Sequence, residues 1–344
     1  MQKTFPQDMQ ASLDSPPVYR RFLAGGTQLL RLSAYEMSMI VGVGILTALI
    51  SLLFTDFQSV WDFVSSVSAT VITALLTAAI AAGWLGSRIG LYSGYMYLIS
   101  GQVLLGTVSA SERWLAAMAT AAITAFALAG VAGRRPLISG RQPARLFYIL
   151  TAAILFFYGP TFAATVVLLC VLFLATTQNH RGLRFFADPV GITVLLVGAL
   201  AGWLIPGLGW NAAANTAWPG GSIFSIPVWS ELAGRLFSLV TVRIPFDILP
   251  WGPLVPLAIV LGIQQGHHNA PFGRFITVWL LTPLGMVLLG VIGQDAAAVL
   301  TLPALSITGS IGLVELLAKI SRMRRQRRQP IVLIDTDLKR KTSR

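Results

Sequence analysis

The stretch FFYGPTFAATVVLLCVLFLATTQNHRGLRFF, residues 156–186, decides how the chain is divided into helices. It belongs to an apolar run, 145–177, that is too long for one comfortable membrane crossing and short for two, since about 20 apolar residues cross a bilayer. Proline removes a backbone donor and clashes with the preceding helical turn. Gly159-Pro160 therefore predicts a break between two helices, 145–158 and 161–177.

The composition indicates a membrane protein. Of the 344 residues, 55% are hydrophobic and only 11% are charged, and the mean hydropathy is +0.73. A soluble domain has about 25% charged residues. Because this chain has too few polar residues to cover its own surface, we expect an all-α, polytopic integral membrane protein.

The apolar windows predict about ten transmembrane helices. We divide the chain into a cytoplasmic N-terminal segment, 1–35, a membrane domain, 36–317, and a basic cytoplasmic tail, 318–344. The ten expected helices are 36–54, 65–86, 89–108, 113–133, 145–158, 161–177, 188–206, 247–264, 274–292 and 295–317.

The distribution of Lys and Arg supports this count. With the N-terminus in the cytoplasm, the outer segments hold only three of the 25 basic residues, Arg113, Arg235 and Arg243. The other 22 lie in inner segments or at inner helix ends, as the positive-inside rule requires. If Gly159-Pro160 were not a break, every later loop would change sides and this asymmetry would be lost. We therefore predict an even number of spans, with both termini cytoplasmic.

The acidic residues lie on the opposite side. One long outer loop, 207–246, is rich in Trp, Gly and Pro, and its Trp rings suit the headgroup level. Carboxylates from separate hairpins could converge on one pocket, where they would bind a metal–phosphate pair or act as a general base. Alternatively, each carboxylate caps a helix end in water. The sequence leaves both readings open. The outer acids are Asp56, Asp62, Glu112, Glu231, Asp247 and Asp295.

Other features of the sequence predict no catalytic or metal site. Dinucleotide, Walker, HExxH and GxSxG motifs are absent. His267-His268 have no further ligand close in sequence and are expected in a polar loop, and Cys170 is expected in the core. The tail QRRQPIVLIDTDLKRKTSR is expected to set orientation and attract anionic lipid, with IVLI as a possible strand for a partner. Because orientation in the membrane explains the net charge of +12, we expect no nucleic-acid partner. Because His267-His268 lack further ligands close in sequence, we expect no metal.

Three stretches carry a family resemblance. They are residues 64–127, with a short basic inner turn and a later acidic turn; ILFFYGPTFAATVVLL, 154–169, which is similar to a "FLTKGP" motif; and 274–313, where Leu302-Pro303 match the end of "KLPxYxLP". Together they resemble the GT-C membrane glycosyltransferases, in particular protein mannosyltransferases and aminoarabinose transferases (family 39-like).

The resemblance implies transfer of a sugar from a polyprenyl-phosphate donor at the outer membrane face. By position, Asp56 matches the family's base or metal-site acid, and Glu112 matches its second outer acid. Tyr158 stands where the family has a lysine, and we add Asp295 and Arg243 as candidate contacts for a lipid phosphate. No cofactor is expected, apart from a divalent cation if the protein is an active enzyme.

The chain departs from the family in three places. Its first outer loop, 55–64, is short; Tyr158 carries no cation to pair with a phosphate; and alanines, 296–298, replace the start of "KLP". We therefore expect a non-catalytic subunit that binds membrane lipid, such as a polyprenyl-phosphate, or a protein partner in a complex of the bacterial inner membrane. The alternative is an active glycosyltransferase. A transporter fits less well, because the expected spans have almost no ionisable residues.

Overall fold

The computed structural model describes residues 32–51, 60–106, 108–128, 142–177, 186–204, 226–264 and 271–328. All the regular structure in these ranges is helical and none of it is strand, which confirms the all-α prediction. The elements are α3 (Ala34–Ser51), α4 (Val60–Leu85), α5 (Ser87–Leu98), α6 (Gly101–Leu104), α7 (Ala110–Leu128), α8 (Gln142–Tyr158), α9 (Pro160–Thr177), α10 (Pro189–Leu204), α11 (Ile226–Ser238), the π-helix η3 (Leu239–Arg243), α12 (Ile244–Asp247), α13 (Leu254–Gln264), α14 (Pro271–Leu288) and α15 (Gln294–Arg328).

The apolar helices identify the chain as a membrane protein. Within the described ranges, α3, α4, α9, α14 and α15 are long and apolar enough to cross a bilayer, and α8 and α10 are shorter apolar helices. At 1.5 Å per residue, a helix of 18 residues such as α9 spans about 27 Å, close to the thickness of the hydrocarbon core.

The predicted break at Gly159-Pro160 is confirmed. Helix α8 ends at Tyr158 and α9 begins at Pro160. Gly159 between them has φ of 97°, a left-handed conformation that glycine adopts without steric cost. Proline is favoured at the first position of a helix, where its missing N–H is not needed. The two helices pack against each other, so the break turns the chain back on itself.

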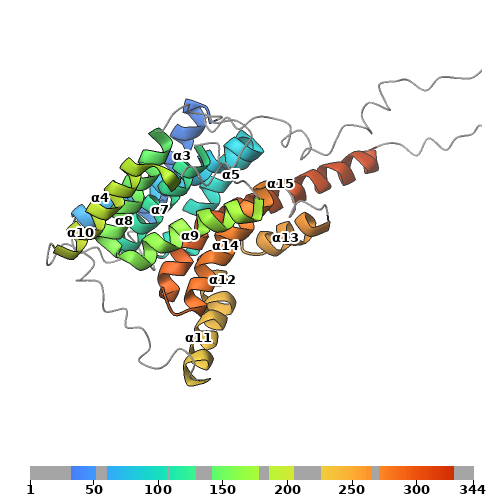
Figure 1. Cartoon of the computed structure of the whole chain (residues 1–344). Helices are drawn as coiled ribbons and strands as arrows, with labels where there is room; N and C mark the ends of the chain where they lie inside the picture. Colours follow the sequence, from blue (N-terminus) through green and yellow to red (C-terminus); the bar gives the residue numbers. More distant parts are fainter. Residues whose placement is uncertain are drawn as a thin grey trace, which may run out of the picture.

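Helix α15 lies at the centre of the helix packing. It packs against α5, α7, α13 and α14, while α4 packs against α5 and α7, and α8 packs against α7, α9 and α10. The C-terminal part of α15 projects past the other helices, and α11 extends from the opposite end of the molecule (Figure 1). The predicted tenth span therefore continues as one helix into the basic tail, up to Arg328.

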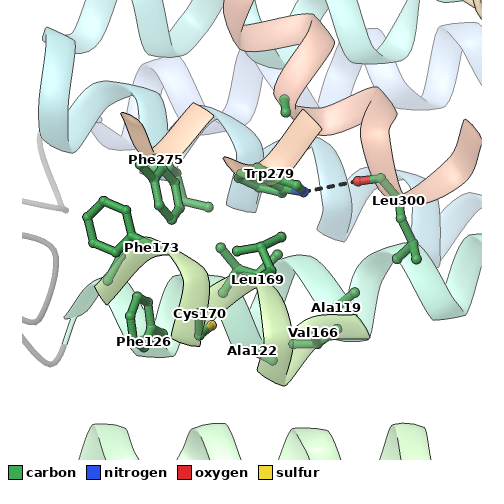
Figure 2. Packing of buried hydrophobic residues seen from close by; sticks show 14 of the residues in the cluster. Ala119, Ala122, Phe126, Val166, Leu169, Cys170, Phe173, Phe275, Trp279 and Leu300 are labelled. Atoms are coloured by element: carbon green, nitrogen blue, oxygen red, sulfur yellow. Dashed lines mark hydrogen bonds between the residues drawn. The ribbon is translucent and has the colours of Figure 1, made fainter. Parts of the chain in front are cut away.

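The main core lies between α7, α9, α14 and α15. Figure 2 shows the indole of Trp279 donating a hydrogen bond to the Leu300 carbonyl, at 3.0 Å. The ring of Phe275 contacts both Trp279 and Phe173, with centroids 5.6 and 5.3 Å apart. Cys170 is fully buried in this core, as the sequence predicts.

Small residues bring several helices into close contact. A Cβ atom on Gly312 of α15 would lie 2.3 Å from the Leu254 carbonyl oxygen of α13. The hydroxyls of Ser93 and Ser310 share a hydrogen bond of 2.7 Å between α5 and α15. Small residues and interhelical hydroxyl contacts are typical of helix packing in membranes, where the hydrophobic effect does not drive association.

Three expected segments need correction. The second half of the loop expected at 207–246 is helical, as α11, η3 and α12, because its apolar residues recur at helical spacing and bury Leu232 and Leu239. The third expected span is interrupted between α5 and α6, where Ile99 and Ser100 end one helix. The eighth is interrupted by a turn at 248–253 between α12 and α13.

Candidate functional site

Glu112, expected to act as a second acid at a site, caps the helix that it begins. Its carboxylate accepts hydrogen bonds from the backbone N–H and the hydroxyl of Ser109, at 2.9 and 2.8 Å, and its own N–H donates to the Ser109 hydroxyl at 3.3 Å. This reciprocal pattern is a capping box, which satisfies N–H groups at the start of α7. Ser33 and Glu36 form the same motif at the start of α3.

Tyr158, expected to contact a lipid phosphate, lies next to Glu112. Its hydroxyl donates a hydrogen bond of 2.7 Å to the carbonyl oxygen of Ser111, and it is close enough to Glu112 for an electrostatic interaction. The structure therefore brings these two predicted residues together. Their contacts join the break between α8 and α9 to the first turn of α7.

Arg243 and Asp295 are also brought together. The Nη2 atom of Arg243 lies 3.3 Å from Oδ1 of Asp295, and its Nε atom lies 3.2 Å from Oδ2 of Asp247. Arg243 ends the π-helix η3 and Asp295 lies in the first turn of α15, where a carboxylate is favoured by the helix dipole. The arginine thus joins two elements through two carboxylates.

Asp247 also belongs to this cluster. The sequence analysis placed it among the outer acids but did not predict it as a site residue. Its side chain is 2% exposed, against 66% for Asp295. The 3.2 Å contact with Arg243 is an ion pair without hydrogen-bond geometry, and neither carboxylate oxygen of Asp247 accepts a hydrogen bond from the described residues. The four-residue spacing in RIPFD was the available signal for this pair.

The two clusters lie toward the same end of the bundle but remain separate. Val108 and Ala116, near the start of α7, pack with Val299, near the start of α15. Across the described residues, no hydrogen bond or ion pair joins Glu112 or Tyr158 to Arg243 or Asp295. Asp56, the predicted base, lies outside the described residues, as do His267 and His268.

The side chains that the structure describes do not form a metal centre. In those ranges, no group of three or more His, Cys, Asp or Glu residues lies close enough to hold an ion.

Arg113 is a buried charged residue that the sequence did not predict to be buried: its side chain is 6% exposed. Its position directly after Glu112 gave no signal of burial, because burial there depends on packing against α4 and α5.

Comparison with known proteins does not assign the chain to a family. No protein-family model matches it, no curated protein matches it, and no solved structure matches it. The resemblance to GT-C glycosyltransferases therefore rests on the three quoted stretches alone, and the role of the two clusters has to be argued from their own geometry.

Proposed function

We propose that this protein is a non-catalytic membrane subunit on a GT-C-like scaffold, which binds lipid or a protein partner in a membrane complex. The proposal includes ten membrane-crossing segments with both termini in the cytoplasm, and a location in a bacterial inner membrane. The bound lipid would be of the polyprenyl-phosphate class, and the C-terminal part of α15, with Lys319, Arg322 and Arg324, is suited to anionic headgroups.

The observation that carries the proposal is the engagement of the candidate side chains in local structure. Glu112 caps α7 and Tyr158 donates to a backbone carbonyl. Arg243 lies between two carboxylates. A phosphate contact needs an uncompensated cation, and the charge of Arg243 is balanced by these two carboxylates. In the part of the chain that the structure describes, each of the four residues, Asp295 included, is therefore already engaged in a hydrogen bond or an ion pair.

The test is a turnover assay with the purified full-length protein. We expect no transfer of sugar from a polyprenyl-phosphate donor, and we expect the Asp56→Asn variant to behave as wild type in a cell with a scorable glycan phenotype. Purification in mild detergent should bring down a stoichiometric partner or retained lipid. Turnover by the wild type that Asp56→Asn abolishes would instead establish the active glycosyltransferase.

A further inference from the structure

Arg113 is a buried cation that the described residues leave without an anion. Its side chain is 6% exposed. Among the described residues, its side chain makes one hydrogen bond, from Nη1 to the Thr70 hydroxyl at 3.3 Å, and its Nε atom has no partner there. No carboxylate among the described residues lies within ion-pair distance of it. The guanidinium remains charged in proteins, so its burial carries a large unfavourable desolvation term.

The position of Arg113 in its helix adds to this cost. It lies just after the first turn of α7, where its N–H makes the first intrahelical hydrogen bond, to Ser109 at 3.1 Å. The positive end of the helix dipole disfavours a cation there. The neighbouring Glu112 does not compensate, because its carboxylate is turned to Ser109.

The surroundings of Arg113 are polar and fixed in place. The Thr70 hydroxyl donates to the Ser66 carbonyl at 2.8 Å, which leaves its oxygen free to accept from Arg113. Tyr97 of α5 is close enough to interact electrostatically with the guanidinium. The indole of Trp114 donates to the Ser65 hydroxyl at 2.7 Å, which holds the start of α7 against α4.

We propose that Arg113 is the anchor of a binding site for a phosphate-type oxyanion between α4, α5 and α7. A guanidinium presents its N–H groups in a fork that matches two phosphate oxygens, and the Tyr97 hydroxyl is a candidate donor to a third. The Thr70 hydroxyl donates to the Ser66 carbonyl and accepts from Arg113, so its part is to hold the guanidinium. Such an anion compensates the charge that the described residues leave unpaired, and it lies at the favourable end of the α7 dipole. This inference goes beyond the proposed function, because that proposal does not use Arg113 and a soluble phosphate would satisfy the site as well as a lipid headgroup.

The first experiment measures phosphate binding by the full-length protein in a neutral detergent. Sodium phosphate is titrated against sodium chloride of equal ionic strength, and the thermal unfolding midpoint is followed by tryptophan fluorescence. We expect a saturable rise in the midpoint for the wild type. In Arg113→Met the apparent Kd should weaken at least about tenfold, because a charge-assisted contact is lost. Arg235→Met is the matched control, since Arg235 is half-exposed and paired with Glu231, and it should respond as wild type.

A second arm identifies the source of the phosphate. Short-chain phosphatidic acid and the matching diacylglycerol are added to the same micelles. A midpoint rise with phosphatidic acid but not with inorganic phosphate assigns the site to a lipid headgroup, and a rise with both shows that the free anion suffices. The diacylglycerol should have no effect on the midpoint.

The stability of the ligand-free variant separates binding from a structural role. The described residues give Arg113 no anionic partner, and removing the desolvation cost of such a buried charge is neutral or stabilising. Arg113→Met without phosphate should therefore unfold no earlier than wild type. If it fails to fold, Thr70→Val replaces it and should weaken phosphate binding by removing the hydroxyl that holds Nη1. A wild type that responds to neither probe, or a response unchanged in the folded variant, overturns the proposal.

Discussion

Ser111 and Glu112 show how polar residues at the start of α7 serve the fold. The carbonyl of Ser111 accepts the Tyr158 hydroxyl, while the carboxylate of Glu112 turns back to cap its own helix. Both contacts are local to one corner, where the α8–α9 break meets α7. At the residue scale, side chains that suggested a phosphate site are therefore explained by hydrogen bonds that position helices.

This assignment predicts that Tyr158→Phe lowers stability. The variant keeps the ring but removes the donor to Ser111, and we expect the free energy of unfolding to fall by about 1 kcal/mol, the typical net contribution of one hydrogen bond. The measurement is SDS titration of the detergent-solubilised protein. Tyr35→Phe is the control, because Tyr35 is 71% exposed, and it should change stability by less than about 0.5 kcal/mol. Equal stabilities for the two variants would contradict the structural role of the hydroxyl.

At the scale of elements, close backbone approach determines which helices are neighbours. Gly312 lets α15 lie directly against the Leu254 carbonyl of α13, and Gly90 lets α5 lie against the Ala78 carbonyl of α4. Neither α13 nor α5 is long enough to cross a bilayer alone, with 11 and 12 residues. Their position therefore depends on packing against the long helices α15 and α4.

Gly312→Ala is expected to disrupt the contact between α13 and α15. The added methyl group would overlap the Leu254 carbonyl oxygen at 2.3 Å, and overpacking of this kind costs about 1–3 kcal/mol. Gly285→Ala in α14 is the matched control, because nothing lies within 4 Å of the added atom. Alanine is the better helix former by about 1 kcal/mol, so this control should be neutral or stabilising in the same SDS titration. A Gly312→Ala variant as stable as its control would refute the close contact.

At the scale of the whole molecule, local chemistry was readable from the sequence and pairing between distant segments was not. The break at Gly159-Pro160 follows from properties of glycine and proline themselves, and the helical class follows from composition. The contact of Arg243 with Asp295 joins residues of two elements that are far apart in the chain. Likewise, the burial of Arg113 depends on α4 and α5. Neither has a local signature, so neither could be read before the helices were placed.

The orientation in the membrane is the remaining property of the whole molecule, and the break between α8 and α9 makes it testable. With ten spans, Arg235 lies outside and Arg322 inside; if α8 and α9 formed one crossing, both would change sides. We therefore expect a membrane-impermeant maleimide to label the Arg235→Cys variant in intact cells and Arg322→Cys only after permeabilisation. Both positions are solvent-exposed in the structure. The wild type is the control, because its one cysteine, Cys170, is buried and should stay unlabelled. The reversed pattern would refute the ten-span topology. With the N-terminus inside, an odd number of crossings before Arg235 places it outside, and merging α8 and α9 into one crossing would make that number even.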